Sequence, residues 1–301
     1  MPPANYVSYH TQSGDSLEVV ARHFHVQPEQ VISEQPIPSQ GLIDVGQLLY
    51  LPRFNDKTTP SENLFPDSEV VYSPSVGNFN VPEYAKTIDG KLRRFVDALT
   101  RRSGAEVIQQ WALEFSINPR LLLSLLELNG SWISGNPETR EKSVYAFGYV
   151  KSDKGGLYDQ TAWACQKLNA GYYGWRSGTL SELVFPDGTH LPLAPSLNAG
   201  TVAVMYYLSQ FQLQSDWQAS LIRLAQIHEN LFGDYHARAA KVEPLLPSGL
   251  QQPQLSLPFP SNATWNYTCG PHTSWGEGDN PPLGALDFAP PTAQSGCANS
   301  V

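Results

Sequence analysis

The sequence predicts a multidomain α+β protein with a small βααβ module, a mainly α-helical middle domain and an incomplete all-β C-terminal segment. The chain of 301 residues is long enough for two or three domains. Two turn-rich stretches without hydrophobic periodicity, 53–82 and 246–257, read as linkers. Only 16 % of residues are charged, and Pro (25) and Gly (23) are plentiful, which favours compact domains joined by stiff linkers. The expected domains are therefore 6–52, 83–245 and 258–301.

Residues 6–52 have the pattern strand, helix, helix, strand. Tyr6–His10 alternates in polarity like a short strand, and residues 46–52 form the closing strand. A second helix is expected to begin at Pro28, with Val31 and Ile32 on its apolar face. The first helix carries an apolar stripe at i, i+3, i+4 and i+7, formed by Leu17, Val20, Ala21 and Phe24.

This module resembles a LysM domain, a family that binds N-acetylglucosamine polymers such as peptidoglycan and chitin. The matching stretches are Ser13–Leu17 (SGDSL), Val19–Phe24 (VVARHF) and Ile43–Pro52 (IDVGQLLYLP). One departure is Gln35, where the family usually has Asn before the proline.

The LysM resemblance implies a shallow groove in which backbone groups of two loops bind the N-acetyl group. Asp15 and Ser16 can also cap the helix that follows, and the two roles are compatible. So shallow a site binds weakly and localises the protein rather than transforming a substrate. The expected carbohydrate-binding residues are Gly14, Asp15, Ser16, Leu17, Gln35, Pro36, Ile37 and Pro38.

The middle domain, 83–245, reads as helical. A helix is expected over Arg93–Gln110, and a buried leucine-rich helix should follow the Asn118-Pro119 cap and end near Gly130. Asn198 should open a later helix.

Three stretches of this domain, 118–132, 145–149 and 197–200, resemble lytic transglycosylases of the lysozyme-like superfamily. Aligning Trp132 with the family's aromatic residue puts Asn129 at the catalytic glutamate position, and Asn cannot donate a proton to a glycosidic oxygen. Glu127 is the alternative general acid, but it lies roughly 200° round the helix from that position. The plainer interpretation makes Glu127 a helix-end carboxylate and the domain non-catalytic. Its aromatic residues either stack on sugars or pack a core: Trp111, Trp132, Trp163, Trp175, Tyr172 and Tyr173.

Residues 258–301 resemble the start of a lysostaphin-type (LytM-like) zinc endopeptidase. The matching motifs are Gly-Pro-His at 270–272 and Leu-Asp-Phe-Ala-Pro at 286–290. The resemblance implies that His272 and Asp287 are the first two zinc ligands, with a third from a later His-x-His motif. No such motif follows in this chain, and two protein ligands do not make a catalytic zinc site. We therefore expect zinc in a longer parent enzyme, and neither zinc nor activity in this chain alone.

Charge and hydropathy limit the partners. The net charge of −9 and the lack of a basic stripe argue against nucleic acid. No run of about 20 apolar residues is present, so no membrane span is expected. No signal peptide is visible, although the LysM resemblance implies an extracellular or cell-envelope location. Cys165 is expected to be a buried thiol, whereas Cys269 and Cys297 either pair or stay free.

Two main functions remain. The chain is either the peptidoglycan-binding N-terminal part of a zinc-dependent murein endopeptidase or a non-catalytic wall anchor that binds N-acetylglucosamine polymers. Glycan cleavage by Glu127 is the third possibility.

Overall fold

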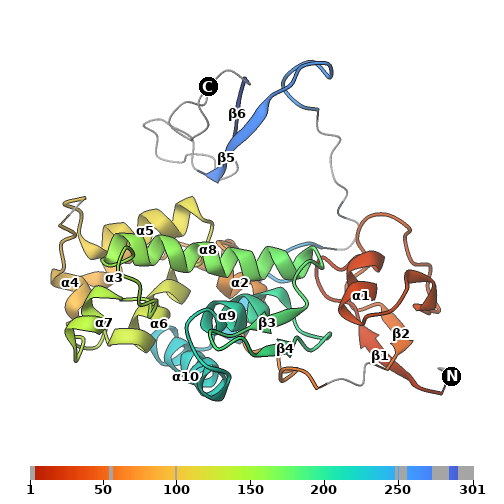
Figure 1. Cartoon of the computed structure of the whole chain (residues 1–301), viewed down its shortest axis with the longest axis horizontal. Coiled ribbons are helices and arrows are strands. Elements are labelled where there is room, and N and C mark those ends of the chain that lie inside the picture. The colour runs from red at the N-terminus through yellow and green to blue at the C-terminus, as the bar shows by residue number, and fades with distance from the viewer. Residues whose placement is uncertain are drawn as a thin grey trace.

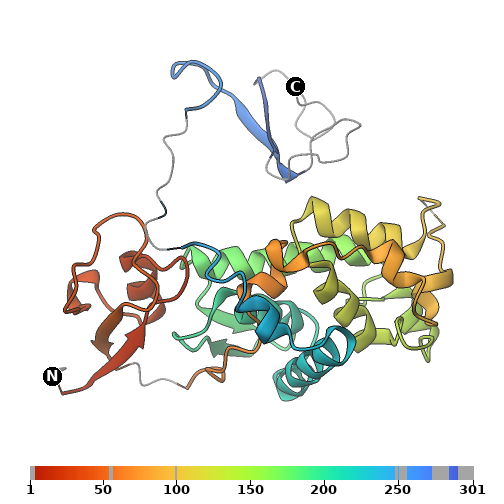
Figure 2. The same ribbon diagram turned by 180° about the vertical axis from the view of Figure 1, so that it is seen from behind.

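The computed structural model describes residues 4–53, 57–98, 100–247, 250, 256–272 and 285–290. An N-terminal module, residues 6–52, sits at one end of an elongated helical body (Figures 1 and 2). The third described part is a pair of strands near the C-terminal end. The arrangement is α+β, as expected, with small antiparallel sheets and a mainly helical middle.

The N-terminal module consists of a two-stranded sheet and a short helix. Strands β1 (Tyr6–His10) and β2 (Leu48–Pro52) pair antiparallel, with Tyr6 opposite Pro52 and His10 opposite Leu48. Helix α1 (Leu17–His23) packs its expected apolar stripe against this sheet. The buried core of the module is separate from that of the helical body and comprises Tyr9, Val20, Ala21, Phe24, Val31, Ile43, Leu49 and Leu51.

The second helix of the module is shorter than expected. It is a 3₁₀ turn, η1 (Pro28–Gln30), and Val31 already has extended backbone angles. Ile32 exchanges backbone hydrogen bonds with Tyr50 of β2, with N···O distances of 2.9 and 2.7 Å. Because this pairing fixes Ile32 in extended geometry, the helix stops before Val31 instead of including both residues.

The helical body is built around two buried helices, α6 and α9, with α8 lying along α9 (Figure 1). The side chains of residues 121–126 in α6 are all fully buried. Asn118 and Asn198 cap α6 and α9 as expected, accepting hydrogen bonds from Arg120 N and Thr201 N. The elements of the body are α2 (Asp67–Val70), η2 (Pro74–Val76), α3 (Val81–Ala85), α4 (Lys91–Arg94), α5 (Gly104–Glu114), α6 (Pro119–Gly130), α7 (Arg140–Val144), α8 (Leu157–Arg176), β3 (Glu182–Val184), β4 (His190–Pro192), α9 (Ala199–Ser209), α10 (Gln214–Phe232) and α11 (Tyr235–Ala239).

Two sequence expectations about this body need correction. The stretch 53–82 was expected to be a tether, but from residue 57 it packs on the body: Phe65 is fully buried, and Thr59 N donates to Pro192 O (2.9 Å). The single helix expected over Arg93–Gln110 is two helices. It is interrupted because Val96 pairs with Ser103, whose side chain then caps α5.

Strands β5 (Asn266–His272) and β6 (Ala285–Ala289) form an antiparallel pair. Residues 273–284 and 291–301, including Cys297, lie outside the described part of the chain.

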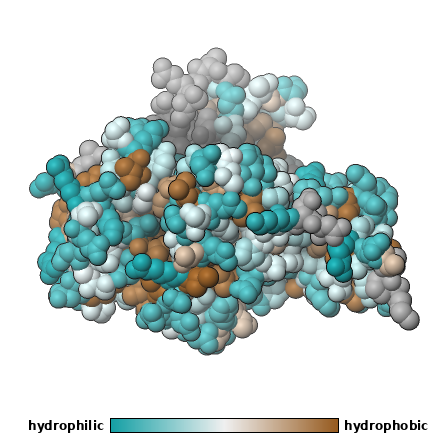
Figure 3. Space-filling model, turned by 60° about the horizontal axis from the view of Figure 1, so that its bottom comes forward, coloured by the Kyte–Doolittle hydropathy of each residue, from teal (hydrophilic) through white to brown (hydrophobic). Residues whose placement is uncertain are grey.

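Hydrophobic residues on the face seen in Figure 3 form small patches separated by hydrophilic ones. None of the helices in the described part of the chain combines the length and hydrophobicity that crossing a bilayer requires.

A buried polar network ties α2, α6, α10 and α11 together. His228 contacts Glu69 through Nε2 (3.1 Å) and Ser124 Oγ through Nδ1 (2.8 Å). Arg238 forms a two-point ion pair with Glu69, with distances of 2.9 and 2.8 Å. Burial opposes the charge on Glu69, but hydrogen bonds from His228 and Arg238 outweigh burial and lower the pKa of Glu69 to about 2. Burial also lowers the pKa of His228, so the imidazole is neutral while Glu69 and Arg238 carry the charges.

We predict that Glu69→Ala destabilises the body by about 3–5 kcal/mol, because it leaves the buried His228 and the half-buried Arg238 without their anionic partner. Urea unfolding at pH 7 measures the change. Glu229→Ala, which removes an exposed carboxylate of α10, should stay within about 0.5 kcal/mol of the wild type. Equal effects of the two substitutions would contradict a stabilising role for the network.

Candidate functional site

The N-terminal module is fixed to the helical body through the end of α8. The imidazole of His23 stacks on the indole of Trp175, with ring centroids 3.6 Å apart and planes within 10°. His23 Nε2 also lies 3.0 Å from Trp175 O. Burial lowers the pKa of His23 to about 4, so the stacked ring is neutral at neutral pH. An aromatic ring of α1 and one of α8 are therefore packed face to face at the junction.

Arg176 makes the second junction contact. Its Nη1 donates to Ser13 O at 3.1 Å, and the same atom lies 3.8 Å from Asp67 Oδ2. Gly14 has a φ of +88°, and a Cβ atom there would lie 1.7 Å from Arg176 Nη2. Glycine at position 14 thus permits both the turn and the close approach of the guanidinium. Gln12 Nε2 adds a hydrogen bond to Ser196 O (2.7 Å) from the same loop.

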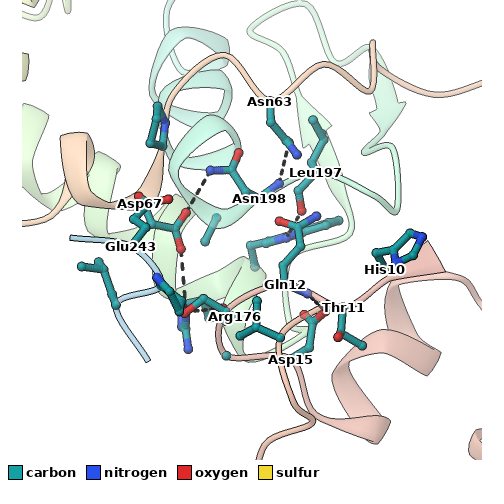
Figure 4. A pocket seen from close by; sticks show the side chains of 18 of the residues that line it. His10, Thr11, Gln12, Asp15, Asn63, Asp67, Arg176, Leu197, Asn198 and Glu243 are labelled. Atoms are coloured by element: carbon teal, nitrogen blue, oxygen red, sulfur yellow. Dashed lines mark hydrogen bonds and ion pairs between the residues drawn. The ribbon is translucent and has the colours of Figure 1, made fainter. Parts of the chain in front are cut away.

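A cavity of about 590 Å³ opens between the module and the body. Three regions contribute to its walls: the N-terminal module, mainly through the loop after β1; the body, through Asn63–Asp67 and the ends of α8 and α9; and the segment after α11. Figure 4 shows polar side chains from all three converging on it, among them Gln12, Asp67, Arg176, Asn198 and Glu243. Pockets at domain interfaces with a few convergent polar groups are the usual place for a ligand site.

Asp67 accepts several hydrogen bonds at the wall of this cavity. Its Oδ1 accepts hydrogen bonds from Gly200 N (2.7 Å) and Asn198 Nδ2 (3.0 Å), and Oδ2 accepts one from Tyr172 OH (3.2 Å). Burial raises the pKa of Asp67 to about 6 against these hydrogen bonds, and the charge of Glu243 adds to the rise. The Asp67 carboxylate lies at the N-terminus of α9, where the helix dipole favours a negative charge. Arg176 lies at the C-terminus of α8, where the helix dipole favours a positive charge.

The first loop expected to bind carbohydrate, Gly14 to Leu17, makes contacts that hold the module together and dock it on the body. Asp15 Oδ2 accepts from Tyr9 OH and Gln12 N, both at 2.7 Å, and burial raises the Asp15 pKa. Ser16 caps α1 by accepting from Val19 N. Capping is therefore confirmed for Ser16, while Gly14 faces the junction.

The second expected loop is open to solvent. Gln35 and Pro36 are exposed, and Ile37 and Pro38 are half-buried. Gln47 holds this loop by donating from Nε2 to Gln35 O (3.4 Å) and Pro36 O (3.3 Å). The segment after the second loop meets the first loop through Ile43 N, which donates to Asp15 O at 2.8 Å. Whether the two loops bind sugar stays a prediction.

Glu127 acts as the cap of the turn after α6. Its Oε2 accepts from Ile133 N (2.9 Å) and Ser134 N (3.1 Å), and Ser134 Oγ donates to Oε1. Asn129, at the position of the family's catalytic glutamate, donates to Leu125 O (2.8 Å) and Tyr207 OH (3.4 Å). Both side chains are committed to holding the fold.

Most aromatic residues considered for sugar stacking belong to the core. Trp132, Trp163, Trp175 and Tyr172 are buried, Trp111 is half-buried, and Tyr173 is 52 % exposed.

The two expected zinc ligands lie on the paired strands β5 and β6. His272 is opposite Ala285, and Asp287 is two residues further along β6. Asp287 itself is opposite Cys269, and the register shifts between these two pairs. Their side chains lie outside the described part of the structure. Within the described residues, no group of three or more His, Cys, Asp or Glu side chains could hold a metal.

Sequence reasoning missed two polar clusters. One is the chain Ser124, His228 and Glu69, which has the residue types of a nucleophilic triad, but all three side chains are fully buried and out of reach of a substrate. The other is the junction cluster of Asp67, Arg176 and Glu243. These residues are more than 60 positions apart in sequence, and no local pattern links them.

The fold defines a helical domain with a small βαβ module docked at one end. A family model, described as LasA, N-terminal domain, matches residues 63–244, and the chain belongs to this family. LasA is a staphylolytic, LytM-like peptidase. The match begins just before the buried Phe65 and ends within the segment that follows α11. Comparison with curated proteins gave no match, and comparison with solved structures gave none either.

We predict that Asp67→Asn removes a pH dependence of stability. The pKa of Asp67 is raised on folding, from about 3.9 in an unfolded chain to about 6. The folded state therefore holds the proton more tightly, and its stability falls as pH rises from about 4 to 6. At one pKa unit per 1.36 kcal/mol, the loss is roughly 3 kcal/mol.

Urea unfolding of wild type and Asp67→Asn at pH 4, 5, 6 and 7 measures the difference. The gap between the two stability curves should change by roughly 2 kcal/mol between pH 4 and pH 7, because the transition is already under way at pH 4, and should flatten above pH 6. Parallel curves would show that Asp67 ionises normally in the folded protein.

Proposed function

We propose that this chain is the peptidoglycan-binding N-terminal part of a zinc-dependent, LytM-like murein endopeptidase. The observation that carries the proposal is the LasA N-terminal domain over residues 63–244, followed by a strand pair bearing His272 and Asp287. A cell-wall peptidase acts outside the cytoplasm, so the proposal includes a location in the cell envelope or the extracellular space.

The N-terminal module is proposed to attach the protein to the wall. Its strand, helix and closing strand support the LysM interpretation, and the Gln35-Pro36 loop is exposed to solvent. Peptidoglycan or chitin-like N-acetylglucosamine chains are the proposed ligands. Because the site is shallow, the module raises the local concentration of enzyme on its substrate.

Zinc is the proposed cofactor of the complete enzyme. His and Asp are both common zinc ligands, so the two residues fit the metal, although a catalytic site needs a third protein ligand. Bound zinc would lower the pKa of its water and polarise the scissile carbonyl. In this chain, His272 and Asp287 would hold the metal from two adjacent strands.

We predict that Pro36→Trp lowers binding to insoluble peptidoglycan by at least about tenfold, because the indole covers the backbone of the exposed loop. Sedimentation with purified sacculi, and separately with chitin, measures the bound fraction. Glu29→Trp, at an exposed site of η1 outside both loops, serves as the control and should bind normally. Equal binding by all three proteins would remove the module's loops from the proposal.

The catalytic half of the proposal predicts that the gene encodes a His-x-His motif after codon 301. Sequencing the locus tests this directly. If an in-frame stop follows codon 301, the alternative of a non-catalytic wall anchor replaces the endopeptidase.

A further inference from the structure

The junction cavity contains an acidic group with unused hydrogen-bonding capacity. Glu243 lies beside Asp67 at one side of the cavity (Figure 4). Its Oε1 accepts from Ser68 N at 2.7 Å. Among the residues that the structure describes, no partner is found for Oε2, and the side chain is half-buried. This oxygen is therefore an acceptor without a donor in a partly enclosed space.

The charges around the cavity favour a cation. Three carboxyl groups line it, those of Asp15, Asp67 and Glu243, against one guanidinium, that of Arg176. That guanidinium is already engaged by Ser13 O and Asp67. Two imidazoles at the rim, His10 and His236, belong to exposed residues. An anionic ligand would meet net repulsion here, whereas an ammonium group would gain charge-assisted hydrogen bonds.

A sugar ring fits the cavity less well than an amine does. Sugars in protein sites commonly stack on an aromatic face. Among the described residues, Trp175 is the only tryptophan, tyrosine or phenylalanine that lines the cavity. Its ring is already stacked against His23. Its Nε1 is also used, donating to Leu197 O at 3.0 Å.

We propose that the junction cavity binds the primary ammonium group of a peptide, with Glu243 Oε2 as the main acceptor and Asp67 as the second negative charge. The peptide's amide groups would meet the carboxamides of Gln12 and Asn63, which also line the cavity and whose NH₂ groups donate to Ser196 O. The source of the peptide rests on the proposed function: stem peptides of the cell wall carry free amines on uncrosslinked diamino acids. The ammonium chemistry itself stands on the cavity alone.

Occupation of this site would strengthen docking of the module. The walls come from the module (Gln12), from the body (Asp67) and from the segment after α11 (Glu243). A ligand contacting all three stabilises their assembled arrangement in proportion to its affinity for it. Binding should weaken below about pH 6, because protonation of Asp67 removes one of the negative charges.

Isothermal titration of the full chain with Nα-acetyl-lysine amide, which carries one side-chain ammonium, tests the proposal. The matched probe is Nα,Nε-diacetyl-lysine amide, and glycyl-glycine amide presents a backbone ammonium instead. We expect binding of an ammonium probe at pH 7, where both amines are mostly protonated, loss of binding on acetylation, and weaker binding at pH 5. Comparing the two ammonium probes shows whether the site takes a side chain or a chain terminus.

The decisive variant is Glu243→Gln, which keeps an oxygen to accept from Ser68 N but removes the charge. It should weaken binding of the ammonium probe at least about tenfold. Glu229→Gln, which removes an exposed charge outside the cavity, is the control and should bind like wild type. Unchanged binding by Glu243→Gln, or equal binding of the diacetylated probe, would overturn the proposal.

The same variants separate this proposal from the proposed function. Sedimentation with sacculi depends on the loop at Pro36, so Glu243→Gln should still attach to them through the module. If ammonium binding is found and attachment to sacculi is not, the cavity site stands and the cell-wall assignment fails. If attachment to sacculi is normal and no ammonium binding is found, the cavity proposal fails and the cell-wall assignment stands.

Discussion

Arg176, at the C-terminal end of α8, is the residue on which the arrangement of the N-terminal module and the body depends. Its guanidinium reaches the Ser13 carbonyl of the module and the buried Asp67 of the body. The preceding residue, Trp175, stacks on His23. One turn of helix thus supplies both an apolar and a charged contact to the module. A small βαβ unit of under fifty residues has little core of its own, so such docking adds to its stability.

This junction has a consequence for the proposed carbohydrate site. The first loop of the expected groove is the loop that docks: Gly14 faces Arg176, and Asp15 is buried. The second loop, at Gln35 and Pro36, remains open to solvent. A glycan that uses both loops would therefore lie close to the helical body. The proposed sugar site and the proposed ammonium site of the junction cavity would then be near each other.

The family match assigns the middle of the chain, residues 63–244, to the LasA N-terminal domain. The comparisons give no support to the resemblance of this region to transglycosylases. Glu127 and Asn129 are engaged in turn and core hydrogen bonds, and most of the aromatic residues pack inside. The buried Glu69, His228 and Arg238 network shows how the domain tolerates charge in its core: each charged group has a partner, so desolvation is compensated. A helical scaffold of this kind can position the parts at its two ends without acting chemically itself.

Short-range sequence signals were enough to predict the local features. Apolar periodicity, Ser and Asn caps and glycine turns placed α1, α6, α9 and the paired strands of the module, because these signals act over a few residues. Sequence pattern did not reveal that residues 57–82 join the core, nor that the second module helix shortens to a 3₁₀ turn. Both follow from hydrogen bonds to distant strands and loops. The junction cavity was decided by tertiary structure alone, because Asp67, Arg176 and Glu243 meet only when α2, α8 and the segment after α11 have packed. Burial then sets the pKa of Asp67, a property of the surrounding dielectric that no neighbouring residue in the sequence encodes.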